Sequence, residues 1–211
     1  YGNNLKKIDG YQEGRWLRVE EDSPFYPPSW FRTEFEAPAA YEGQNVRLHL
    51  DGINFRANVW LNGTLIADDS EVIGMFRRFE FDVTEALNYG GNNVLAVEII
   101  APGKLPEGAY RTKQVEATTG WDDHNPQPPD LNMGIWRDVY LTASGPLMLR
   151  HPYVGSDLEL PGMSYADLTV QVEVTNLTNR SREVELRGSI GDISFEETAD
   201  LEPQEKRWLD I

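Results

Sequence analysis

Apolar and polar side chains alternate along most of this chain with a period of two, which is the pattern of strands that turn one face to a core. Residues 30–37 place Phe31 and Phe35 on one face and charged side chains on the other. The same alternation recurs in four further segments: residues 45–52, 76–83, 92–100 and 135–142. These segments predict an all-β fold, and their short spacing favours an antiparallel sandwich.

Two local signals refine this prediction. In residues 56–68, two apolar runs flank Asn62-Gly63, a pair that supplies the positive φ angles of a type I′ turn, so a β-hairpin is predicted there. Residues 83–90 favour a single helical turn, with Thr84 as its expected cap.

A second series of alternating segments begins after residues 145–154 and covers residues 166–176, 182–190 and 193–201. Its spacing resembles the opening half of an immunoglobulin-like sandwich. We therefore expect a first domain over residues 1–148 and part of a second over residues 149–211. Because about sixty residues are few for such a sandwich, we expect the chain to be cut at its C-terminus.

Charge and composition exclude several classes of function. The chain of 211 residues has a formal net charge of −16 and no cysteine. So acidic a surface repels phosphate backbones and anionic lipids, and no apolar run reaches the length of a membrane span, so neither a nucleic acid nor a membrane is expected as a partner. Without cysteine there is no disulfide scaffold and no thiol chemistry.

Residues 118–141 end in a strand pattern, but before it tryptophan, proline, aspartate and histidine crowd together in a stretch too proline-rich for a helix or a central strand. Asp122, Asp123, His124 and Asp130 could ligate a metal, but one histidine without cysteine is a poor zinc set and the spacing is not that of a calcium loop. We expect no metal and no cofactor. Neither a phosphate-binding glycine loop nor a distinct catalytic pair of carboxylates is evident, and His49 is interpreted as a surface residue.

Among six tryptophans, Trp60 and Trp136 lie within strand patterns and are expected in the core. Trp121 instead follows Gly120 in a loop and precedes Asp122 and Asp123. An exposed ring beside carboxylates can stack on the C–H face of a sugar while the carboxylates accept hydrogen bonds from hydroxyls or attract an ammonium group. The alternative, a tryptophan that only anchors the loop, stays open.

Several ordered motifs together are similar to the N-terminal part of family-2 glycoside hydrolases. They are "WFRTEFEAP", "LHLDGINFRANVWLNG", "FEFDVTEAL", "NNVLAVEI" and "GIWRDVYL". The stretches "YGNNLKKIDGY" and "GWDDHNPQPPDLNMGIWRDV" most resemble the exo-β-D-glucosaminidase branch, and β-mannosidases come next. The resemblance implies a jelly-roll, galactose-binding-like sandwich followed by a partial immunoglobulin-like sandwich, with a catalytic (β/α)₈ barrel beyond the chain.

The resemblance also implies a role for the unusual loop. It assigns contact with the terminal sugar to Trp121 and Asp122, and Asp123 adds negative charge that suits an amino sugar. Mannosidases usually carry Asp-Trp-Gly-Pro where this sequence has "DDHNPQPP", which argues against a mannose pocket.

The function that follows is a non-catalytic N-terminal region of an exo-acting, retaining β-glycosidase. No catalytic residue is expected in this chain, since the family's two glutamates lie on the barrel. Its expected partners are a terminal β-linked sugar and its own barrel, and a periplasmic or secreted location is favoured over a cytoplasmic one. Two alternatives remain: a self-sufficient carbohydrate-binding module, and a purely structural spacer.

Overall fold

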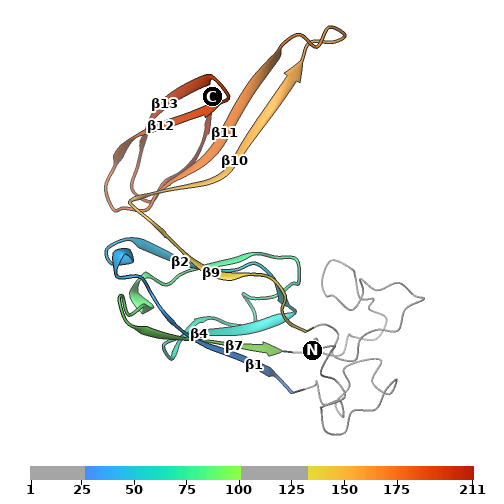
Figure 1. Ribbon diagram of the computed structural model, residues 1–211. Coiled ribbons are helices and arrows are strands. Elements are labelled where there is room, and N and C mark those ends of the chain that lie inside the picture. The colour runs from blue at the N-terminus through green and yellow to red at the C-terminus, as the bar shows by residue number, and fades with distance from the viewer. Residues whose placement is uncertain (1–26, 101–132) are drawn as a thin grey trace, which may run out of the picture. The chain divides into compact units, whose positions relative to one another are not determined.

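The computed structural model describes residues 27–100 and 133–211, and nearly all of its regular structure is β-strand (Figure 1). The contacts of the chain divide it into two compact units, residues 1–143 and 144–211. The predicted all-β class, a jelly-roll sandwich followed by a partial immunoglobulin-like sandwich, is confirmed. The boundary at residue 148 stays a prediction. The described residues contain no helix long and apolar enough to cross a membrane.

Two antiparallel sheets form the first unit. One has the strand order β1-β7-β4-β5 and the other the order β6-β2-β9, while β3 and β8 form a short separate pair. Two 3₁₀ turns, η2 and η3, accompany them. The bounds are β1 Ser29–Glu36, η2 Ala39–Tyr41, β2 Asn45–Leu50, β3 Ile53–Asn54, β4 Arg56–Leu61, β5 Thr64–Ala67, β6 Phe79–Asp82, η3 Thr84–Ala86, β7 Asn92–Ile100, β8 Gly134–Ile135 and β9 Val139–Ser144.

The alternation in the sequence becomes the core of this first sandwich. Strand β4 buries Ala57, Val59 and Leu61 while the residues between them face outward. Strand β7 behaves in the same way along its nine residues. Val46, Leu48, Leu50, Val97 and Ile99 complete the centre of the core, each at most 2% exposed. Removal of this apolar surface from water is the main force that holds the two sheets together.

The predicted hairpin at Asn62-Gly63 is confirmed. Both residues have positive φ angles, 52° and 83°, and the turn closes the pairing of Leu61 with Thr64. Asn62 also ties the hairpin to the rest of the sheet, since its Nδ2 donates to the Ala86 carbonyl and to Asn93 Oδ1, each at 2.8 Å. Its Oδ1 accepts from the Val94 amide at 2.9 Å.

The predicted helical turn is present as η3, but the expected cap is wrong. Thr84 lies inside the turn, and its Oγ1 accepts a hydrogen bond from the Val46 amide at 2.9 Å. The carboxylate of Asp82 accepts from the Thr84 amide instead, at 3.0 Å. Asp82 is the last residue of β6, so the strand itself brings the acceptor to the start of the turn.

The interpretation of His49 as a surface residue is also wrong, since this side chain is only 7% exposed. It does point away from the core, as the alternation predicts, but neighbours on the outer face of its sheet cover it. Tyr140 stacks on the imidazole with ring centroids 4.6 Å apart, Thr142 Oγ1 lies 2.7 Å from Nε2, and Glu80 lies 3.8 Å from Nδ1. Strand periodicity gives the side of the sheet but not what covers that side.

The second unit is a smaller sandwich of the sheets β10-β11-β14 and β12-β13. Its strands are β10 Leu147–Leu158, β11 Ala166–Asn176, β12 Arg182–Ile190, β13 Ile193–Leu201 and β14 Lys206–Asp210. The core is compact and aliphatic, and its buried members are Val172, Val174, Val184, Leu201 and Leu209. All three segments that the sequence predicted here are strands.

Asn62→Ala is expected to lower the free energy of unfolding of the first unit by about 2–3 kcal/mol. The change removes hydrogen bonds worth about 1 kcal/mol each, and alanine tolerates the positive φ poorly. Asn62→Gly serves as the control, because it keeps the backbone conformation and loses only the side-chain bonds. Denaturant unfolding of the three proteins measures both effects, and an alanine variant within 0.5 kcal/mol of the wild type would contradict this role of Asn62.

Candidate functional site

The residues that the sequence singles out as a sugar contact, Trp121, Asp122 and Asp123, lie outside the described residues. The structure does describe the strands on either side of the segment that carries them. Strand β7 ends at Ile100, and β8 begins at Gly134. The place where this segment joins the sandwich is therefore well defined.

Strand register brings together the two strands on either side of residues 101–132. Ile100 pairs with Arg56, and Gly134 pairs with Asn54. Arg56 and Asn54 are only two residues apart, so the end of β7 and the start of β8 lie close together in the first unit. The amide of Trp136 then donates to the Gly52 carbonyl at 3.0 Å, which extends this pairing by one further contact. We call residues 52–56 together with residues 133–136 the stem.

The centre of the stem is buried and closely packed. Asn54 is 1% exposed, and Phe55 and Met133 are each less than 10% exposed. Gly134 has a φ of 140°, and a Cβ at this position would lie 3.3 Å from the Phe31 ring. A glycine is therefore required both by its backbone conformation and by the close approach of an aromatic ring.

Trp136 is the last residue of the stem, and its side chain lies on the outer side. Its Nε1 donates to the Met75 carbonyl at 3.1 Å, and the Arg137 guanidinium lies 4.6 Å from the ring centroid. Phe76 meets the indole edge to face at 6.0 Å. The prediction that Trp136 belongs to the core is wrong, because the side chain is 39% exposed. It instead connects residues 73–78 to the start of β9, across the surface at this end of the unit.

The prediction for Trp60 is wrong as well. Trp60 lies on the outer face of β4, where it is half-buried, and its ring stacks on Trp30 at a centroid distance of 5.1 Å. The neighbouring residues Val59 and Leu61 face the core instead, and both side chains are buried. Tryptophan in a strand pattern thus marks a large contact area, but here the contact is between two outward rings.

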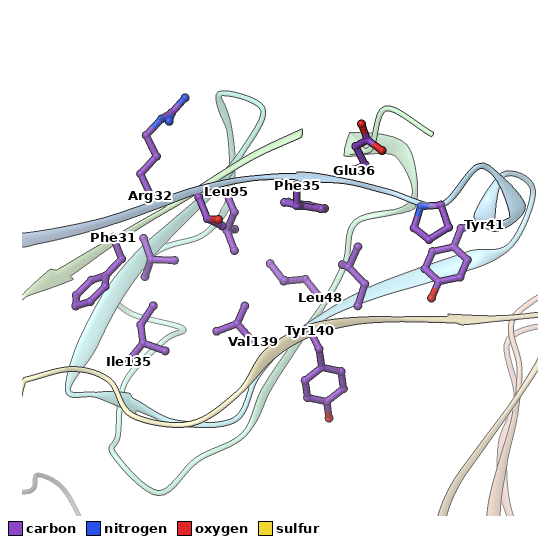
Figure 2. A pocket seen from close by; sticks show the side chains of 14 residues that line it. Phe31, Arg32, Phe35, Glu36, Tyr41, Leu48, Leu95, Ile135, Val139 and Tyr140 are labelled. Carbon is purple, nitrogen blue, oxygen red and sulfur yellow. The ribbon is translucent and has the colours of Figure 1, made fainter. Parts of the chain in front are cut away.

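A hollow of about 580 Å³ opens between the two sheets, beside β1 and β9 (Figure 2). Phe31, Phe35, Leu48 and Val139 point into it, while Arg32 points away from it. A sugar needs several polar partners for its hydroxyls, and this lining is mainly apolar. The hollow is therefore part of the sandwich interior and not a sugar site.

Within residues 27–100 and 133–211, no group of three or more His, Cys, Asp or Glu side chains could hold a metal ion. The carboxylates near β2 are engaged in ion pairs instead: the Arg47 guanidinium lies 3.5 Å from Glu80 and 3.6 Å from Asp82. These pairs stabilise the outer face of the β6-β2-β9 sheet. Because both carboxylates are paired with Arg47, they do not form the acid and opposing nucleophile of a glycosidase.

The sequence did not predict the stem. Its residues pair across about eighty positions, so no local pattern connects Ile53 with Ile135. One signal was available: Gly52 directly precedes the strand residues Ile53 and Asn54, and a glycine beside a strand often marks the close approach of another group. Here that group is the Trp136 ring, which a Cβ on Gly52 would meet at 2.7 Å.

Residues 25–137 match the family described as "Glycosyl hydrolase 2 galactose-binding domain-like". Among similar proteins is an exo-β-D-glucosaminidase of Streptomyces avermitilis, which is 33% identical over 87% of this chain and 19% of the relative. An exo-β-D-glucosaminidase of Arthroderma benhamiae is 35% identical over 80% of this chain and 18% of the relative. A mannosylglycoprotein endo-β-mannosidase of Lilium longiflorum is 32% identical over 95% of this chain and 22% of the relative.

Solved structures agree. The crystal structure of the exo-chitosanase CsxA of Amycolatopsis orientalis superposes with a TM-score of 0.76 and 26% identity, covering 99% of this chain and 23% of that protein. The chain thus spans about a fifth of the length of these relatives.

Gly52→Ala is expected to destabilise the first unit by about 1–3 kcal/mol, because the new methyl group would overlap the Trp136 ring and force the stem to shift. Gly91→Ala is the matched control, since its Cβ would make only ordinary contact with Asn88 at 3.7 Å. The two unfolding transitions compare the variants directly. Equal stability of both variants would contradict the close packing of the stem.

Proposed function

Since the chain belongs to the glycosyl hydrolase 2 family through its galactose-binding-like domain, we propose that it is the non-catalytic N-terminal region of an exo-acting, retaining β-glycosidase. The proposed substrates are β-glucosaminides first and β-mannosides second. This proposal rests mainly on the 33% sequence identity to an exo-β-D-glucosaminidase. The match extends over 87% of this chain and 19% of that enzyme's length. The acid/base and the nucleophile belong to the rest of the polypeptide.

The proposed contribution of this chain to the active site is the segment 101–132. Trp121 offers an aromatic ring to the C–H face of the terminal sugar, and Asp122 accepts hydrogen bonds from its hydroxyls. Asp123 adds a second negative charge for the ammonium group of a glucosamine. The stem supports this proposal, because a binding segment whose two ends leave from one buried edge loses less conformational entropy on binding than one with free ends.

The free energy that such a loop must contribute to the transition state is modest. A charge-assisted hydrogen bond is worth about 1.5–3 kcal/mol, which corresponds to about a 10- to 100-fold effect on rate when it is made in the transition state. The loop would thus raise the efficiency and select the sugar, while the chemistry of bond cleavage stays with the catalytic carboxylates, as in other retaining glycosidases.

Asp122→Ala in the complete polypeptide is expected to lower kcat/KM for an aryl β-D-glucosaminide by ~10- to 100-fold, because one charge-assisted hydrogen bond to the sugar is lost. Asp192→Ala is the control, since this exposed aspartate lies in the second unit and has no proposed role. Steady-state kinetics and the unfolding transition are measured together. An unchanged kcat/KM in a folded Asp122→Ala protein would refute the site assignment, and a self-sufficient binding module would then be the better account.

Asp123→Asn separates the two sugar classes. The change keeps the size of the side chain and removes its charge, so we expect a loss of about 5- to 20-fold in kcat/KM for β-glucosaminides, in line with a weakened ion pair. For β-mannosides, which carry no ammonium group, we expect a change of less than twofold. Equal losses on both substrates would contradict a charge-selective role for Asp123.

A further inference from the structure

The outer face of the β1-β7-β4-β5 sheet carries two tryptophans that take no part in the core. Strand β7 lies between β1 and β4. Trp30 of β1 pairs with Glu98 of β7, and Trp60 of β4 pairs with Ala96 of β7. Alanine has only a Cβ, so the two rings meet above β7, with centroids 5.1 Å apart and planes 27° from parallel. We call Trp30, Trp60, Asn58 and Glu98 the tryptophan face.

Core packing does not account for Trp30. The side chain is 59% exposed, and the inner side of β1 is supplied by Phe31 and Phe35, which pack against the buried cluster. Among the strands that the structure describes, β1 also lies at the edge of its sheet. An aromatic side chain with so much of its surface in water contributes little to folding, and exposed aromatic surface of this kind marks binding sites.

A carboxylate with a fixed orientation lies beside the rings. Glu98 Oε2 accepts a hydrogen bond from Asn58 Nδ2 at 2.9 Å. The Asn58 amide is itself held in place, because its Oδ1 accepts from the Asp69 amide at 2.9 Å. The second carboxylate oxygen of Glu98 accepts no hydrogen bond from the described residues, so it has capacity for a ligand.

Further negative charge lines β1. The guanidinium of Arg32 donates to Glu34 Oε1 at 2.6 Å. This bond, with a weaker one from Asn92, holds the pKa of Glu34 below its ordinary value, so the carboxylate stays ionised in mildly acidic solution. Arg32 is thereby paired, while Glu36 and Glu98 add charge on the same face. The surface around the rings is acidic, as is the chain, whose net charge is −16.

We propose that the tryptophan face is a surface site for cationic amino-sugar chains, such as β-(1→4)-linked glucosamine oligomers. Trp30 covers the C–H face of one sugar ring. The Glu98 carboxylate and the face of the indole ring together attract a protonated amine. An anionic glycan is disfavoured by the acidic surface. The choice of an amino sugar among ammonium ligands rests on the proposed function.

The site can be tested on this chain by itself. Isothermal titration with a glucosamine hexamer at pH 5.5 and low salt is compared with the N-acetylated hexamer of the same length, which has the same rings but no charge. We expect the amine oligomer to bind at least ten times more tightly. Raising the salt to 0.5 M should weaken it, because exposed charges are screened at that concentration.

Single-residue variants test which side chains form the binding site. Trp30→Ala is expected to weaken binding of the amine oligomer at least tenfold. Glu98→Gln keeps an acceptor for Asn58 and removes the charge, so the preference for the amine oligomer over its acetylated form should disappear. Trp208→Ala is the matched control, since Trp208 is 48% exposed in the second unit. If Trp30→Ala does not fold, Trp30→Phe and Glu98→Gln carry the test.

Several results would overturn the proposal: no binding of either oligomer at millimolar concentration, undiminished binding by Trp30→Ala, or an equal loss in Trp208→Ala. Binding by this chain but not by the complete polypeptide would also overturn it, since the rest of the protein would then cover the face. A failure of the proposed function appears instead as unchanged hydrolysis by Asp122→Ala, so the two failures are distinguishable.

Discussion

Backbone pairing at residues 54–56 is the constraint on which the arrangement of the first unit depends. One short stretch pairs with β8 through Asn54 and with β7 through Arg56, so it joins strands that lie more than thirty residues apart in sequence. Each inter-strand hydrogen bond contributes only about 1 kcal/mol, but at the buried Asn54 a backbone group that lost its partner would cost more. Ile100 and Gly134, which lie on either side of residues 101–132, are therefore held close together, and this supports the proposed role of those residues in a sugar pocket.

The two faces of the β1-β7-β4-β5 sheet serve different purposes. Inward residues such as Val59 and Val97 are fully buried and supply the hydrophobic free energy of folding. Outward residues contribute little to this free energy, so Trp30 and Trp60 can stack beside the carboxylate of Glu98 without loss of core packing. The fold thus supports two chemically related sites on one scaffold, the proposed pocket contact at the loop and the proposed surface site on the sheet. Both combine an aromatic ring with aspartate or glutamate.

Sequence periodicity was sufficient for most of the strands and for the hairpin at Asn62-Gly63, because both depend on local side-chain alternation and local backbone preference. Trp60 was misplaced because a large apolar side chain was expected to face the core, whereas it faces outward between the buried Val59 and Leu61. His49 and Trp136 were misplaced for another reason. Alternation gives the direction of a side chain but contains no information about neighbours from distant strands, such as Tyr140 over His49 or Met75 beside Trp136. The stem was missed because it depends on long-range register. The roles of Trp121, Asp122 and Asp123 were inferred from resemblance, and they stay predictions.

The most direct measurement is a crystal structure of the complete polypeptide bound to a glucosamine-configured inhibitor. The account predicts that a carboxylate oxygen of Asp122 lies within about 3 Å of a sugar hydroxyl, as a charge-assisted hydrogen bond requires, and that the Trp121 ring contacts the same sugar. A bound inhibitor with no atom of residues 101–132 in contact with it would contradict the central claim that this chain completes the pocket.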